Sequence, residues 1–69
     1  MNDWPTIEEV KATEDKKRLV AMGIVAWGNC YIETPPLYFG ELLILIGKKL
    51  GLEKAATYEN LVAYANSLK

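Results

Sequence analysis

The chain has 69 residues, of which 51% are hydrophobic and 25% charged, and its formal net charge is −1 at pH 7. These figures predict one small globular domain over residues 1–69, with no room for a second. A chain this short hides only about 60% of the surface that its unfolded form exposes, so such domains usually add a disulfide, a metal or a partner chain. Cys30 is the only cysteine and histidine is absent, which excludes an intrachain disulfide and the familiar structural zinc sites. We therefore expect a partner chain, with no metal and no cofactor.

The reactive side chains are too few and too scattered to predict an enzyme. Cys30 has no histidine to make it a thiolate, so we interpret it as a small buried apolar residue. The carboxylates form no evident nucleophile and base pair, and the dispersed glycines open no phosphate-binding loop. Glu33 and Glu41 stand in the apolar middle of the chain, where an acid either faces solvent at a boundary or pairs with a cation, and we prefer the first interpretation.

The N-terminus and the apolar runs together predict a cytoplasmic protein. The chain begins with polar residues, Trp4 and Pro5 rather than with a basic leader, and a lone thiol fits a reducing compartment. The apolar stretches 19–32 and 42–46 are shorter than the ~20 residues that span a bilayer. We expect no membrane association.

The first half of the chain is predicted to be helical. Thr6 and Glu9 have the spacing of a capping box, which predicts a short, weakly packed helix that leads into the next one, with Glu14 or Asp15 able to restart it. From residue 19, apolar side chains recur at helical spacing on two adjacent faces: Leu19, Val20, Met22, Ile24, Ala26, Trp27, Cys30 and Tyr31. Burial on two sides is expected. The alternative is a β-hairpin around residues 28–29, because Gly-Asn is a typical hairpin turn.

A second long helix is predicted over residues 36–50. Pro35 and Pro36 end the preceding element, and Gly51 suits a left-handed cap after the two lysines of the last turn. Residues 42–46 are apolar on every face of this helix, so it needs cover all round, which a single chain of this length is not expected to give. We therefore predict a homodimer whose interface contains Leu42, Leu45 and Ile46.

The last helix is expected to begin after Thr57 as its N-cap, with one apolar stripe packed onto the 36–50 helix. The stripe consists of Tyr58, Leu61, Val62, Ala65 and Leu68. The predicted fold class is thus all-α, a compact homodimer of three to four short helices per chain.

Residues 43–65 resemble a helix-turn-helix, which makes a DNA-binding transcriptional regulator the alternative function. Gly51 matches the turn glycine and Gly47 the small residue four positions before it, and three apolar positions agree: Ile46, Leu50 and Leu52. Thr57 and Asn60 depart from the pattern, because that family has apolar anchors there. The candidate recognition helix is also poor in the basic residues that contact phosphates and base edges.

Protein binding is the function that we favour from the sequence. The predicted partner-binding residues are of the types that usually anchor interfaces: Trp4, Arg18, Tyr31, Tyr38 and Phe39. Three of these aromatic residues flank the two prolines, where a rigid backbone loses little entropy on binding. In its size, acidity and lack of catalytic chemistry the whole chain resembles the small helical inhibitors that bacteriophages encode, including anti-activators and anti-defence proteins. No diagnostic motif carries this resemblance, which implies an inhibitor or adaptor that blocks a host protein, with a transcription factor as one candidate.

Overall fold

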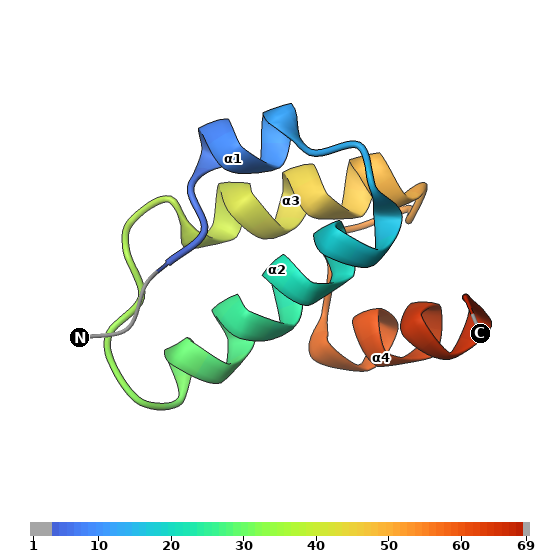
Figure 1. The fold of residues 1–69 in the computed structure, drawn as a ribbon. Coiled ribbons are helices and arrows are strands. Elements are labelled where there is room, and N and C mark those ends of the chain that lie inside the picture. The colour runs from blue at the N-terminus through green and yellow to red at the C-terminus, as the bar shows by residue number, and fades with distance from the viewer. Residues whose placement is uncertain (1–3, 69) are drawn as a thin grey trace.

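Four helices make up the described part of the chain, residues 4–68 of a computed structural model. They are α1 (Ile7–Ala12), α2 (Lys16–Cys30), α3 (Phe39–Leu50) and α4 (Tyr58–Ser67). Figure 1 shows α1 lying along α3 and α2 running obliquely to α3, while α4 lies against α2. The predicted all-α class is confirmed over these residues. The alternative hairpin is wrong, because Gly28 and Asn29 lie in the last turn of α2, where Asn29 is buried.

Side-chain caps begin three of the helices where the sequence predicts them. The hydroxyl of Thr6 accepts a hydrogen bond from the Glu9 amide at 3.1 Å and donates one to the Glu9 carboxylate at 3.2 Å. Asp15 restarts the chain as the N-cap of α2, and Thr57 caps α4 through the amide of Asn60. These bonds satisfy backbone donors that a helix start leaves without intrahelical partners.

The long apolar helix α3 begins later than the predicted residue 36. The carbonyl of Pro36 accepts a bond from the Phe39 amide at 3.0 Å, so residues 36–39 form a turn ahead of the helix. Tyr38 is the N-cap with ψ near 3°, outside the helical range, and gives no side-chain cap. The C-terminus agrees with the prediction, since Gly51 adopts a left-handed φ of 80°.

A single chain covers most of α3, contrary to expectation. Leu42 and Ile46 are fully buried, and Leu43 and Leu50 are nearly so. The short helix α1 packs along α3 and adds the fully buried Val10, while α2 covers another side. The premise that α3 needs a second subunit is therefore wrong, and the homodimer stays a prediction without this argument.

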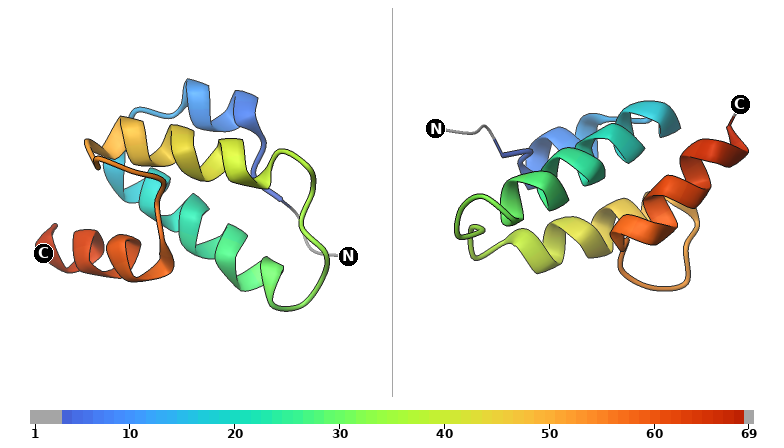
Figure 2. Two further views of the ribbon diagram at one scale, coloured as in Figure 1. Left: turned by 180° about the vertical axis from the view of Figure 1, so that it is seen from behind. Right: turned by 90° about the horizontal axis from the view of Figure 1, so that it is seen from below.

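The helix α4 packs mainly against α2, whereas the sequence predicts that it packs onto α3 (Figure 2). The segment 51–57 turns back across α3, and its Ala56 amide donates to the Leu43 carbonyl at 3.1 Å. This path carries α4 to the side of α2, where the fully buried Leu61 meets Gly23. A Cβ atom built on Gly23 would lie 2.6 Å from Leu61 Cδ1, so the glycine permits the close approach of the two helices.

Candidate protein-binding surface

Three aromatic rings join the N-terminal arm, α2 and α3. Phe39 meets the ring of Trp4 edge-on at a centroid distance of 5.8 Å and the ring of Trp27 at 5.3 Å. The indole Nε1 of Trp27 donates to the Ala56 carbonyl at 3.1 Å. Edge-to-face pairs add about 0.5–1.5 kcal/mol to the burial of the rings. Trp4 and Phe39, predicted to bind a partner, are thus half-buried residues that pack within the chain.

A hydrogen bond between distant residues ties the N-terminal arm to the connection between α2 and α3. The indole Nε1 of Trp4 donates to the Glu33 carboxylate at 2.7 Å. Hydrogen bonds to a carboxylate oxygen belong to the stronger class of hydrogen bonds. The sequence did not predict this indole partner, because it left Glu33 either facing solvent or pairing with a cation.

We call residues 31–38, which connect α2 to α3, the apolar loop, because large apolar side chains project from it into solvent. Tyr31 is 78% exposed, Ile32 is 73% exposed and Leu37 is fully exposed. These three side chains account for the largest exposed fractions among the large hydrophobic residues of the described chain. Both predicted partner-binding tyrosines lie in the apolar loop, Tyr31 exposed and Tyr38 half-buried. Ile32 and Leu37 were missed, although their nearness to the two prolines was a usable signal.

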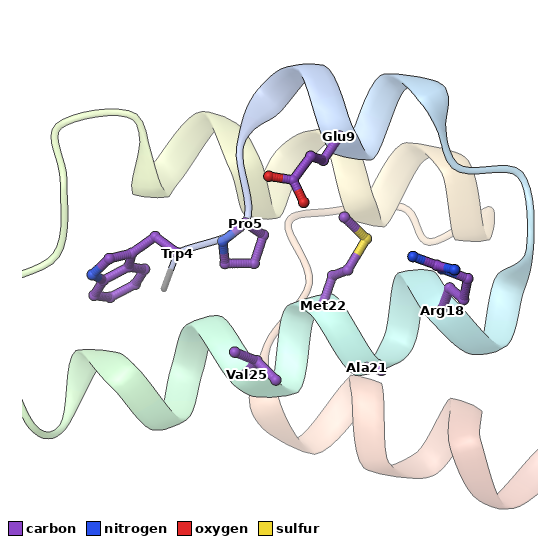
Figure 3. Close-up of a pocket in the computed structure, with 7 residues that line it drawn as sticks. All are labelled: Trp4, Pro5, Glu9, Arg18, Ala21, Met22 and Val25. Carbon is purple, nitrogen blue, oxygen red and sulfur yellow. The ribbon is translucent and has the colours of Figure 1, made fainter. Parts of the chain in front are cut away.

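A groove of about 510 Å³ runs between α1 and α2 and brings two further predicted residues together. Figure 3 shows Met22 extending from α2 toward α1, with Arg18 beside it and Glu9 on the opposite wall. The lining residues are Trp4, Pro5, Glu9, Arg18, Ala21, Met22 and Val25. Arg18 and Trp4, both predicted to bind a partner, thus line one groove, one from each side.

The predicted dimer-interface residues do not form an exposed surface. Leu42 and Ile46 are fully buried inside the single chain, so their side chains are not accessible to a second copy. Leu45 is half-buried and lines a smaller groove of about 270 Å³ between α1 and α3. The exposed Ile44 lies at the same place and was not among the predicted residues.

The described residues contain no group of three or more side chains suited to hold a metal ion. Within the same residues, no helix has the length and hydropathy needed to cross a membrane. Cys30 is a free cysteine, and it is half-buried rather than fully buried as expected.

The geometry after α3 departs from the helix-turn-helix that the sequence resembles. That motif joins its helices by a turn of about three to four residues, whereas α3 and α4 are connected by the longer segment 51–57. The supposed recognition helix α4 turns Leu61, Ala65 and Leu68 of its predicted stripe toward α2, whereas Tyr58 of the same stripe is 47% exposed. Its first turn carries the acidic Glu59. Comparisons of the chain with models of protein families, with curated proteins and with solved structures find no match.

Proposed function

We propose that this chain is a small regulatory protein that binds another protein through its apolar loop and thereby inhibits or recruits it. The observation that carries the proposal is the exposure of Tyr31, Ile32 and Leu37 within one connection. Full burial of one large aliphatic side chain contributes about 1.5–3 kcal/mol, so these residues have much to gain from a partner surface.

The apolar loop is also held in place before any partner arrives. The amides of Ile32 and Glu33 both donate to the Asn29 carbonyl, which extends the end of α2 by a turn. The Glu33 carboxylate is tied to Trp4, and Pro35 and Pro36 restrict the backbone that follows. Pre-ordered contact residues reduce the entropy lost on binding, which favours recognition of a folded protein surface. A host regulatory protein, such as a transcription factor, is the class of target that the resemblance to phage inhibitors implies.

The test is to compare retention of proteins from the lysate of the source cell on immobilised wild type and on Leu37→Asp. We expect a specific protein to be retained and its retention to fall at least about tenfold in the variant, since the lost burial is on the order of 2 kcal/mol. Leu37 is fully exposed, so its replacement should change the free energy of unfolding by no more than about 0.5 kcal/mol.

Ile44→Asp is the matched control, because Ile44 is an exposed apolar residue of α3 outside the apolar loop. It should retain the same protein as wild type. Equal retention by Leu37→Asp and wild type would contradict the proposal, as would retention of a DNA duplex alone.

A further inference from the structure

The outer face of α2 carries a second apolar surface, distinct from the apolar loop, which the described elements leave uncovered. Ala21, Val25 and Gly28 follow one another at the four- and three-residue spacing of a helix–helix seam, and all three are exposed. Val25 is 49% exposed, and a Cβ atom built on Gly28 would meet nothing within 4 Å. We call these three residues the α2 stripe. It borders the groove between α1 and α2, which Ala21 and Val25 line.

The charges of α2 oppose its own dipole. Its first turn holds the cations Lys16, Lys17 and Arg18 and no acidic residue, while its last turn holds no basic residue. A helix N-terminus carries partial positive charge and its C-terminus partial negative charge, so cations are unfavourable at the first end and favourable at the second. The carboxylate of Asp15 partly offsets this unfavourable charge from the N-cap position, where it accepts a hydrogen bond from the Lys17 amide.

We propose that a second copy of this chain covers the α2 stripe, with the two α2 helices antiparallel about a two-fold axis at Val25. In this arrangement each basic first turn lies beside the negative C-terminal end of the other copy's α2, at both ends of the contact. The charges that are unfavourable within one chain thereby become complementary between two chains.

The shape of the stripe fits the same arrangement. Ala21 and Gly28 lie on either side of Val25, so in an antiparallel pair the small residues of one copy face those of the other and the backbones approach closely. The groove with Arg18 and Met22 on its α2 wall then receives side chains from the other copy. This interface replaces the one predicted through α3. With the axis at Val25, each basic first turn lies opposite the start of the other copy's apolar loop, so the two surfaces adjoin and different substitutions test each of them.

Disulfide cross-linking tests the position of the axis. In a Cys30→Ser background, Val25→Cys should form a covalent dimer under mild oxidation, because a residue on a two-fold axis meets its own copy within disulfide range. Ile44→Cys in the same background is the matched control, since Ile44 is 48% exposed and Val25 is 49% exposed. Non-reducing electrophoresis should show the dimer for the first variant only. Equal cross-linking of both variants would overturn the proposal.

Equilibrium sedimentation tests the association itself. Wild type should show twice its chain mass of 7.7 kDa, and Val25→Asp should weaken the dimer by roughly a hundredfold, because symmetry places the change twice in one interface. Ile44→Asp should leave it unchanged. Arg18→Glu should weaken the dimer yet raise the thermal midpoint of the dilute monomer, since an acid suits a helix N-terminus. A wild type that stays monomeric up to about 100 μM would show that this face does not bind a second copy.

Discussion

The two connections that flank α3 treat their apolar side chains in opposite ways. The apolar loop before α3 exposes Ile32 and Leu37, whereas the segment 51–57 after α3 turns inward and buries Ala56 completely. Two hydrogen bonds to the backbone of Ala56 hold the second connection in place. The Ala56 amide donates to the Leu43 carbonyl, and the Ala56 carbonyl accepts a bond from the indole of Trp27. The difference indicates that one connection serves the fold, while the other leaves its side chains available.

Gly47 gives the largest expected effect, because it is where the inward connection crosses α3. A Cβ atom built there would lie 2.5 Å from the carbonyl oxygen of Lys54. This oxygen belongs to the backbone, so it cannot move away as the end of a flexible side chain could. In an ordinary helix interior, glycine to alanine stabilises by about 1 kcal/mol. We expect Gly47→Ala to lower the free energy of unfolding by about 3 kcal/mol instead, measured by urea denaturation.

Gly40→Ala is the control for this reversal of sign, since Gly40 lies in the first turn of the same helix with nothing within 4 Å of its built Cβ. It should be neutral or stabilise by up to about 1 kcal/mol. If Gly47→Ala behaved like Gly40→Ala, the tight crossing of 51–57 over α3 would be wrong.

Trp27→Phe is expected to have the second largest effect. Phenylalanine keeps a ring against Phe39 but removes the Nε1 donor to the Ala56 carbonyl and leaves space beside it. Loss of the bond and of packing should cost about 2 kcal/mol. Amide hydrogen exchange should rise first at Ala56, whose own bond to Leu43 depends on the same segment. If the Ala56 amide exchanged as slowly as in wild type, the Trp27 indole would not be what holds the segment 51–57 in place.

Trp4→Phe makes the same chemical change at the other connection and should cost less, about 1 kcal/mol. It removes the indole bond to Glu33 while keeping a ring near Phe39. The effect should appear as faster proteolysis within residues 31–38, because the tie holds the N-terminal arm to the apolar loop. If Trp4→Phe lost more stability than Trp27→Phe, the connection 31–38 would contribute more to the stability of the fold than the segment 51–57, which would contradict the comparison.

Local signals in the sequence predicted where most elements begin and end. Thr6, Asp15, Thr57 and Gly51 act through bonds within a few residues or through one backbone dihedral, so their roles can be seen in a short window. The helical spacing of apolar residues likewise predicted buried faces for α2 and α4, whereas α1, expected to be weakly packed, buries Val10 completely.

What the sequence did not predict depends on contacts between distant residues. An apolar stripe on α4 shows that the helix packs, but the crossing at Gly47 determines that it packs on α2. The bond from Trp4 to Glu33 joins residues 29 positions apart, and the short α1 covers α3 through Val10 and Ile7. The candidate site also depends on the tertiary fold. Leu37 and Leu42 are the same residue type, yet Leu37 is exposed and Leu42 is buried.

The arrangement of both tryptophans around Phe39 also gives the molecule an internal optical reporter. Trp4 and Trp27 share one aromatic neighbour, yet their indole nitrogens bond to opposite connections. Intrinsic fluorescence therefore reads the two connections separately once either indole is replaced. With Trp27→Phe, the remaining emission comes from Trp4, whose indole is bonded to the apolar loop. A target that engages that loop should shift this emission without any attached dye.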